Sequence, residues 1–452
     1  MDLAYRTEDS NPLLAAVCPE EVLAGTNLNI HAADEMLIFL EESFGGDRDP
    51  ALAVYFQSGL LIWETFRAIL TWHFGSLDRV GRLLDFASGY GRVTRFIVRD
   101  LPPERVWVSD IYTEGVRFQE EQLGVHGQVS TASPDDFQAA ERFDCILVSS
   151  LFSHLPEATF HGWLARLRGL LAPGGLLVFS VHDWSLLHPE RERTPEGFLF
   201  EAISESGSLA KSQYGTCWVT EAFVRRAVER AAPGSSVHRI PRGFCNFQDL
   251  YVVADRPAAD FSGLTVRALP EGYVDSCKLT PPDRLDLSGW VVDRVSGQPV
   301  REVRVAVDGE VLQVCRLFHP RGDVAELLFK NDVRIEAQGW RFAVRLPRGT
   351  SRSTGALTIR VIDANGLESV LYAATIDAAL LASLQRDLVT MAAETARLRK
   401  EHAEALVQRR AEADYEISVL EARIAAMENS RFWKIRNGWF GIKRKLGLTR
   451  EE

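Results

Sequence analysis

Residues 83–93 read LLDFASGYGRV, and three local patterns follow one another in this stretch. The first four residues form an apolar run that is typical of a buried β-strand. Gly89 and Gly91 then predict a tight turn, because glycine adopts backbone conformations that other residues avoid and lets a ligand approach closely. The helix-like sequence that follows would direct its N-terminus at the turn, where polar or anionic groups are favoured. The stretch therefore predicts a ligand site between a strand and a helix.

The same alternation continues on both sides of this stretch. Short apolar runs at residues 106–109, 145–148 and 176–181 are separated by longer helix-like segments. Strands that alternate with helices predict a parallel sheet covered on both faces, as in Rossmann-like α/β domains. We assign residues 51–257 to this α/β domain and residues 1–50 to an N-terminal helical segment.

Residues 275–375 show a different pattern, with apolar residues at every second position. Val303, Val305 and Val307 alternate before Asp308-Gly309, a pair that is typical of a hairpin turn. The same period returns around Trp340 and Leu357. About a hundred residues of short alternating strands predict a β-sandwich.

A long helix is predicted next, since residues 367–437 contain neither glycine nor proline. Within residues 377–428, apolar residues recur at alternating spacings of four and three, with charged residues beside them. This period of 3.5 indicates a coiled coil, and hence a homo-oligomer. A single amphipathic helix folded back on the body is the alternative.

The tail, residues 429–452, combines positive charge with aromatic residues. Seven basic residues lie between residues 429 and 450 without any acid. Phe432, Ile435, Trp439 and Ile442 fall on one stripe at helical spacing. A basic amphipathic helix of this kind is typical of an anionic membrane surface. Capping of the coiled coil, or docking on another domain, is the alternative.

Composition excludes several classes of protein. The 452 residues carry a formal net charge of -11, and an acidic chain is poorly suited to wrapping nucleic acid. The N-terminus lacks a signal-peptide pattern, and no apolar run reaches the roughly 18 residues of a spanning helix. The cysteines form no CxxC pair, so neither a disulfide framework nor a metal site is expected, and we expect a cytoplasmic protein. They are Cys18, Cys145, Cys217, Cys245, Cys277 and Cys315.

The acids at the strand ends indicate which ligand the glycine turn would take. Asp110 follows Gly91 by 19 residues and closes the next strand, where a carboxylate can accept both ribose hydroxyls of a nucleoside cofactor. A dinucleotide fingerprint would read GxGxxG, but Thr94 stands where the third glycine would be. Asp85 can instead meet the amino-acid part of a sulfonium cofactor, which favours S-adenosylmethionine.

Residues 50–257 resemble class I S-adenosylmethionine-dependent methyltransferases. Residues 84–91, Asp110, residues 143–155 and residues 167–176 are similar to four motifs of that family, in the same order. Ala87 departs from the pattern, which usually has glycine there. The resemblance implies a cofactor site that is built from seven residues: Asp85, Ala87, Ser88, Gly89, Gly91, Asp110 and Ser149.

Methyl transfer to a hydroxyl also needs a base near the strand ends. His154 and His182 lie at such positions, and an imidazole titrates near neutral pH. Each can alternatively be a hydrogen-bonding residue that orders its loop. Asp183 either orients His182 or caps the next segment. The acceptor pocket is expected to include residues 184–219, where Tyr214, Cys217 and Trp218 stand among polar residues, and ordinary loop packing of these residues is the alternative.

The layout of the chain suggests an acceptor class. The segment 275–375 looks like immunoglobulin-like modules of bacterial glycosyltransferases, and the tail is similar to the C-terminal tails of surface-polysaccharide glycosyltransferases. The resemblance implies an O-methyltransferase of a sugar or growing surface glycan, peripheral at the inner face of the cytoplasmic membrane. A degenerate domain that serves as a coiled-coil scaffold, and a methyltransferase of a small metabolite or a protein side chain, are the alternatives.

Overall fold

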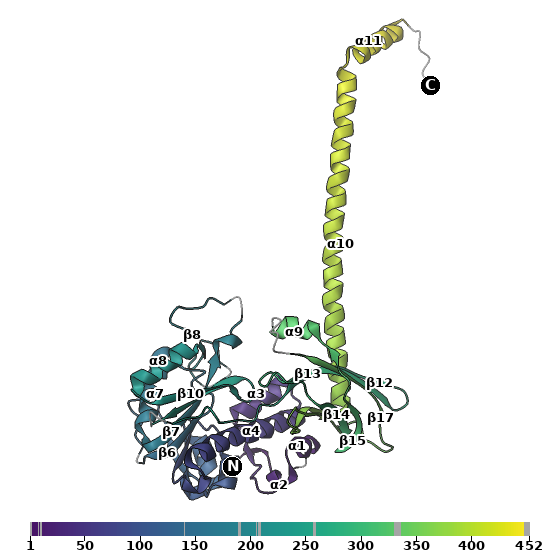
Figure 1. Cartoon of the computed structure of the whole chain (residues 1–452). Helices are drawn as coiled ribbons and strands as arrows, with labels where there is room; N and C mark the ends of the chain where they lie inside the picture. The colour runs from purple at the N-terminus through teal and green to yellow at the C-terminus, as the bar shows by residue number, and fades with distance from the viewer. Residues whose placement is uncertain are drawn as a thin grey trace. The chain divides into compact units, whose positions relative to one another are not determined.

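The computed structural model divides into two compact units, residues 1–380 and residues 381–452 (Figure 1). It describes the whole chain except residues 1, 8, 10, 140, 189–190, 205, 207–208, 256–258, 330–335 and 447–452.

A mixed sheet forms the centre of the α/β domain, with the order β10-β11-β7-β6-β3-β4-β5. The strands from β5 to β7 are parallel, whereas β11 and β10 are antiparallel at the β7 edge. The apolar runs predicted as strands are strands, and the Rossmann-like prediction is confirmed. Their bounds are β3 (Leu83–Phe86), β4 (Val106–Asp110), β5 (His126–Val129), β6 (Phe143–Val148), β7 (Leu171–Asp183), β10 (Ser236–Phe244) and β11 (Gln248–Ala254).

Each face of this sheet has its own apolar core, because successive side chains of a strand point to opposite faces. Leu83 and Leu147 pack in one cluster, and Leu84 and Val148 pack in the other. Helices α4 and α5 contribute residues to the first cluster, and α7 and α8 contribute residues to the second. The helices are α4 (Arg48–Phe74), α5 (Thr94–Asp100), α6 (Thr113–Leu123), α7 (Glu157–Gly169) and α8 (Glu221–Ala231), with 3-10 turns η1 (Leu77–Arg79), η2 (Pro103–Arg105) and η3 (Trp184–Leu186).

Two short strands extend the sheet beyond the end of β7. In the segment predicted to build the acceptor pocket, β8 (Phe198–Glu201) pairs with β9 (Thr216–Val219). Strand β9 then pairs in parallel with the last residues of β7, so that His182 lies opposite Trp218 and Asp183 opposite Val219. The segment after β7 is therefore part of the sheet and fixes the surroundings of His182.

The described residues of the N-terminal segment form three helices and a small two-stranded sheet. Helix α4 begins at Arg48 and continues into the α/β domain, so that it crosses the predicted boundary between residues 50 and 51. The Asp34 side chain caps α3 by accepting from the backbone N–H groups of Met36 and Leu37. The elements are β1 (Leu3–Tyr5), α1 (Pro12–Val17), α2 (Glu20–Leu23), β2 (Ile30–His31) and α3 (Glu35–Ser43).

A buried arginine joins this segment to the glycine turn. Arg95 is 1% exposed, and its Nε donates to the backbone oxygen of Gly91 at 3.0 Å. Its Nη1 donates to the backbone oxygens of Asn27 and Asn29 at 3.0 and 2.9 Å. Because a buried cation is stable only when its donors are satisfied, the carbonyls of the N-terminal segment are required for this position of Arg95.

Two four-stranded antiparallel sheets follow, in the orders β12-β13-β17-β16 and β15-β14-β18-β19. Apolar residues of both sheets form one core, which includes Val303, Val305, Trp340, Leu357 and Ile376. The predicted turn at Asp308-Gly309 joins β14 to β15. The immunoglobulin-like class stays a prediction. The elements are β12 (Glu271–Thr280), β13 (Arg284–Val292), β14 (Glu302–Val307), β15 (Glu310–Cys315), β16 (His319–Pro320), α9 (Gly322–Phe329), β17 (Gln338–Arg345), β18 (Ala356–Ile362) and β19 (Glu368–Thr375).

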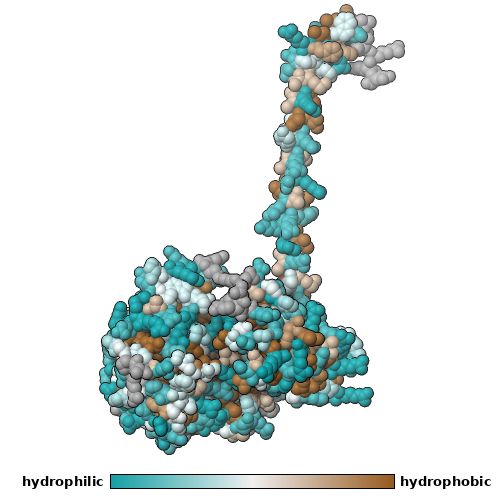
Figure 2. Space-filling model, viewed as in Figure 1, coloured by the Kyte–Doolittle hydropathy of each residue, from teal (hydrophilic) through white to brown (hydrophobic). Residues whose placement is uncertain are grey.

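The chain continues as one long helix, α10 (Ile376–Asn429), followed by α11 (Arg431–Lys445). Ser430 separates them and caps α11, since its side chain accepts from the backbone N–H of Trp433. Hydrophobic residues recur along α10 between hydrophilic stretches (Figure 2). The coiled coil stays a prediction, and residues 447–452 of the predicted tail lie outside the described residues. No helix in the described part of the chain is long and apolar enough to cross a membrane.

Candidate functional site

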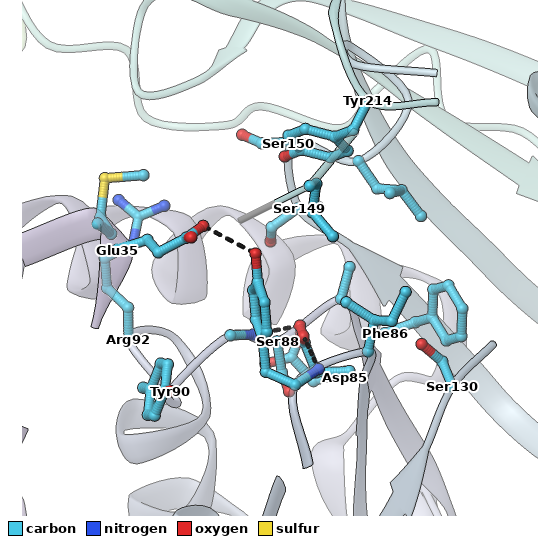
Figure 3. Close-up of a pocket in the computed structure, with 18 of the residues that line it drawn as sticks. Glu35, Asp85, Phe86, Ser88, Tyr90, Arg92, Ser130, Ser149, Ser150 and Tyr214 are labelled. Carbon is cyan, nitrogen blue, oxygen red and sulfur yellow. Dashed lines mark hydrogen bonds between the residues drawn. The ribbon is translucent and has the colours of Figure 1, made fainter. Parts of the chain in front are cut away.

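A cavity of about 250 Å³ opens at the carboxyl ends of β3, β4 and β6 (Figure 3). Ligands of open α/β sheets bind at this edge, where the loops between strands and helices converge. Glu35 reaches the cavity from α3, Ser149 from the end of β6, and Tyr214 from the segment before β9 (Figure 3). Three parts of the chain that are distant in sequence therefore form one site.

Asp85, at the end of β3, is a buried acid in the wall of the cavity. Its carboxylate is 1% exposed, and its Oδ2 accepts from the Thr94 hydroxyl at 2.7 Å. Its Oδ1 has no hydrogen-bond partner among the described residues. Burial raises the pKa of Asp85 to about 7, although the hydrogen bond from Thr94 opposes this shift. A cationic ligand group would supply the missing partner and favour the ionised carboxylate.

Asp110, at the end of β4, fixes the glycine turn and lies beside it in the same wall. Its Oδ2 accepts from the backbone N–H of Gly89 at 2.7 Å, and its Oδ1 accepts from that of Tyr112 at 3.0 Å. Burial raises its pKa, and these hydrogen bonds to the charged form oppose that shift. A carboxylate has about four acceptor sites, so Asp110 keeps capacity for ligand hydroxyls.

A buried polar network supports the turn from behind. Gln119, on α6, donates from Nε2 to Ser88 Oγ and to the backbone oxygen of Gly89, both at 2.9 Å. Its Oε1 lies 2.8 Å from the Thr94 hydroxyl, which is the same hydroxyl that contacts Asp85. Helix α6 can approach this closely because residue 115 is glycine: a Cβ there would lie 2.6 Å from the Gly89 oxygen.

The turn uses three left-handed backbone conformations. Gly89 and Gly91 have φ of 56° and 81°, and Ala87 has φ of 58°. Glycine adopts these values without strain, whereas alanine does not. Ala87, where the sequence departs from the methyltransferase pattern, is therefore a strained residue of this turn.

Replacing this residue by glycine, Ala87→Gly, should stabilise the protein. The strain at φ of 58° disappears, and we expect the free energy of unfolding to rise by roughly 0.5–1 kcal/mol. Urea denaturation followed by circular dichroism measures this change. The matched variant Ala132→Gly changes an exposed cavity residue without positive φ and should not stabilise. Equal effects of both variants would contradict the assignment of strain to Ala87.

The buried acid predicts a pH dependence of stability without ligand. Because the folded-state pKa of Asp85 is raised, its protonated form favours the native state, and this contribution is lost as the pH rises from about 4 to about 7. The variant Asp85→Asn cannot ionise. The free energy of unfolding of the wild type, relative to that of this variant, should therefore fall as the pH rises across this range. Denaturant titrations at several pH values give the difference, and a difference that is independent of pH would contradict the shift.

Two serines follow β6 at the predicted fourth-strand motif. Ser149 lines the cavity, and its buried Oγ has no hydrogen-bond partner among the described residues. Ser150 has φ of 59°, and its backbone N–H donates to Ser180 Oγ at 2.8 Å. The Ser149 hydroxyl is therefore available to a ligand, and the strained Ser150 redirects the chain at the cavity rim.

The predicted catalytic residues lie behind the cavity wall. His154 Nδ1 lies 2.7 Å from the backbone oxygen of Gly215, and the His154 ring stacks on the ring of Tyr214. His182 is 8% exposed, and burial, followed by the nearby His154, lowers its pKa to about 4. Neither histidine is among the residues that line the cavity. Their roles as bases stay predictions.

The contacts of Asp183 indicate a structural role. Its Oδ1 accepts from the backbone N–H of Ser185 and caps η3, which is one of its two predicted roles. Its Oδ2 pairs with Arg239 at 3.0 Å. Arg239 also pairs with Asp249 and Glu221, so Asp183 belongs to an ion-pair cluster at the β7 edge.

Several residues of the wall were not predicted. Arg92 lies in the wall, and its Nη1 donates to Ser58 Oγ at 2.8 Å. The sequence feature that could have identified Arg92 is its position directly after Gly91. Glu35 comes from the N-terminal segment, which carries no motif, and its Oε2 accepts from the Tyr112 hydroxyl at 3.1 Å.

The charges of the wall match one type of ligand. Apart from three tyrosines, the titratable groups among its described lining residues are four carboxyl groups and one guanidinium: Asp34, Glu35, Asp85, Asp110 and Arg92. S-adenosylmethionine carries a sulfonium, an ammonium and a carboxylate, as well as two ribose hydroxyls. A wall rich in carboxylates with one arginine complements that set, so the residues present fit this cofactor.

Comparison with known proteins gives the class. Residues 84–177 match the family described as "Methyltransferase domain". The protein is therefore a methyltransferase, and the residues of the cavity wall fit S-adenosylmethionine as its cofactor. The matched residues run from β3 into β7 and contain the glycine turn, Asp110 and Ser149. No curated protein matches the chain.

Solved structures of methyltransferases are similar to part of the chain. The glycopeptide N-methyltransferase MtfA shares 19% identity, covering 42% of this chain and 89% of its own, with a TM-score of 0.32. The plantazolicin methyltransferase BpumL, in complex with SAH, shares 14% identity over 49% of this chain and 96% of its own, with a TM-score of 0.34. The 1,6-didemethyltoxoflavin-N1-methyltransferase of Burkholderia thailandensis shares 19% identity over 50% and 88%, with a TM-score of 0.32.

Proposed function

We propose that this methyltransferase transfers its methyl group to a sugar hydroxyl of a surface glycan, at the inner face of the cytoplasmic membrane. The observation that carries the proposal is α11. This helix places exposed aromatic and aliphatic side chains among basic ones, and a glycan that grows on a lipid carrier would be presented at a membrane surface.

On the cofactor side, the ammonium, the carboxylate and the ribose hydroxyls of S-adenosylmethionine each have a candidate partner in the wall. We assign the ammonium group to Asp85, whose Oδ1 lacks a partner, and the carboxylate to Arg92. Asp110 would accept the ribose hydroxyls, and Ser149 offers a further hydroxyl. The bound cofactor supplies a methyl group that its sulfonium already activates, so the chain's main task is to align the acceptor.

On the acceptor side, the wall combines an aromatic ring with polar groups. Tyr214, Gln213 and Ser150 line the cavity together with Leu151 and Leu209. A sugar offers both hydroxyls and an apolar ring face, which suits such a mixed wall. His154 and His182 remain the proposed bases, although neither is among the residues that line the cavity.

The membrane proposal rests on the side chains of α11. Phe432, Ile435 and Trp439 are exposed by 74%, 71% and 57%. The Arg436 guanidinium lies over the ring of Trp433 at 4.5 Å, and the Lys443 ammonium lies over the ring of Trp439 at 5.7 Å. Aromatic rings and cations side by side are what an anionic interface binds.

The oligomer proposal rests on α10. Apolar residues of the heptad positions are all more than half exposed in the single chain, although they are large enough to form a core. We propose that a second copy of α10 covers them. They include Leu384, Leu388, Met391, Leu398, Leu406, Ile417, Leu420, Ile424 and Met427.

Methyl transfer to glycan from cells that lack the protein tests the proposal. Purified full-length protein and S-adenosylmethionine with a ¹³C-labelled methyl group are incubated with that glycan, and mass spectrometry locates the label. Label on a sugar oxygen supports the proposal, and the Asp110→Ala variant should give none. An unlabelled glycan, with label found instead on a small metabolite or a protein from the same cells, would overturn it.

A further inference from the structure

A cluster of aromatic rings lies beside the cavity at the carboxyl edge of the sheet. The His182 ring is 5.5 Å from that of Phe247 and 6.2 Å from that of Trp218. Phe247 is 53% exposed, and Trp218 is partly exposed. An exposed aromatic ring next to a ligand cavity is a candidate binding surface rather than part of the core.

The backbone around Phe247 is strained. Arg242, near the end of β10, and Cys245 and Asn246, in the connection from β10 to β11, have φ of 52°, 52° and 57°. Residues other than glycine seldom adopt these values, and they persist where the surroundings hold them. Such strain concentrates at binding sites, so this connection is a candidate for function.

Contacts within the hairpin and from outside it hold this strained conformation. The Asn246 side chain donates from Nδ2 to the backbone oxygen of Leu269 at 2.6 Å, and the Leu269 N–H donates back to Oδ1 at 3.4 Å. Arg242 Nη1 donates to the backbone oxygen of Asn246 at 3.2 Å. Phe247 is therefore presented by a fixed backbone, which lowers the entropy lost when a ligand binds.

A buried glutamine connects the ring cluster to the cavity. Gln248, 5% exposed, donates from Nε2 to His182 Nε2 at 3.2 Å. Its Oε1 accepts from the Ser150 hydroxyl at 3.3 Å, and Ser150 lines the cavity. Gln248 thus contacts both Ser150 at the cavity rim and the His182 ring of the cluster.

A second connection runs through stacked rings. Tyr214, in the cavity wall, stacks on His154 at 4.7 Å, and His154 lies 5.8 Å from His182. His182 in turn contacts Phe247. The cavity and Phe247 are therefore joined by consecutive ring contacts along the edge of the sheet.

We propose that Phe247 and Trp218 form a second subsite of the acceptor, which binds a sugar ring adjacent to the one that is methylated. This inference rests on the proposed function, because it requires a glycan acceptor. A sugar ring packs its C–H face on an aromatic ring and directs its hydroxyls outward. The enzyme would then prefer acceptors of two or more units over a single sugar.

Kinetics with acceptors of different length test the subsite. Glycan from cells without the protein is cleaved and fractionated into single sugars and longer fragments, and methyl transfer by the full-length protein is measured with each. For Phe247→Ala we expect KM for the longer fragments to rise about 10-fold, the scale of one lost aromatic contact, with KM for single sugars unchanged. Phe247→Tyr retains the ring and should behave as the wild type.

Phe44→Ala is the matched control, since Phe44 is 41% exposed and lies at the end of α3 opposite Glu35. It should leave every KM unchanged. The subsite would be overturned if Phe247→Ala and the wild type had equal KM values for long fragments. It would also be overturned if Phe247→Ala raised KM for single sugars by the same factor as for long fragments. Neither result would contradict glycan methylation itself. Absence of methyl transfer by the wild type to every fragment would overturn both proposals.

Discussion

The variant Asp110→Ala is expected to lose binding of S-adenosylmethionine, with affinity lowered by roughly 100-fold. The carboxylate is the proposed acceptor for the ribose hydroxyls, and a hydrogen bond to a charged group contributes about 1.5–3 kcal/mol. The same carboxylate accepts from the N–H groups of Gly89 and Tyr112, so the variant also loosens the turn. Isothermal titration calorimetry on the full-length protein measures the change.

The conservative variant Asp110→Asn separates these two roles. One amide oxygen can still accept from Gly89, whereas the amide nitrogen cannot accept from the Tyr112 N–H and the charge is lost. We expect both the affinity and the melting temperature to lie between those of the wild type and Asp110→Ala. Wild-type affinity in both variants would contradict the assignment of Asp110 to the cofactor.

The second large effect concerns the membrane. Deleting residues 429–452 is expected to lower partitioning onto anionic vesicles by at least about 100-fold, since each basic residue near the surface contributes about 1 kcal/mol and α11 alone carries six. The affinity of the intact chain should fall as salt is raised, because the attraction is partly electrostatic. Co-sedimentation with phosphatidylserine-containing vesicles gives both values.

A matched variant separates charge from aromatic insertion. Replacing Trp439 and Phe440 by alanine keeps all basic residues of α11, and partial loss of binding to anionic vesicles is expected, with the salt dependence retained. Vesicles of phosphatidylcholine alone should bind the intact chain weakly. Equal partitioning of the intact and truncated chains onto anionic vesicles would contradict the proposal that the tail binds the membrane.

The cofactor side was predictable because local sequence determines it. An apolar run, two glycines and a strand-terminal acid specify a strand, a turn and a carboxylate with little help from distant residues. Asp85 and Asp110 then meet because parallel neighbouring strands end at the same edge. Glu35 could not be found in this way, since its contact with Tyr112 spans 77 residues of sequence.

The acceptor side depends on contacts that leave no local pattern. The positions of His154 and His182 at strand ends were visible, but not what surrounds their rings. That is set by β9, which pairs with the end of β7, and by Gln248 from the next hairpin. None of the left-handed residues Arg242, Cys245 and Asn246 at the end of β10 and in the connection to β11 is glycine, so the sequence did not mark the strain at these three positions.

The hydrogen bonds of Arg95 determine the shortest chain that can fold around the glycine turn. A protein that starts at residue 51 would lack Asn27 and Asn29, whose carbonyl oxygens accept from the buried guanidinium. Without them, the charge would have to stay unsolvated or move into water and pull α5 away from the turn. Truncation for crystallisation, or fusion of the catalytic part to another protein, should therefore retain the first fifty residues, which belong to the enzyme as much as the sheet does.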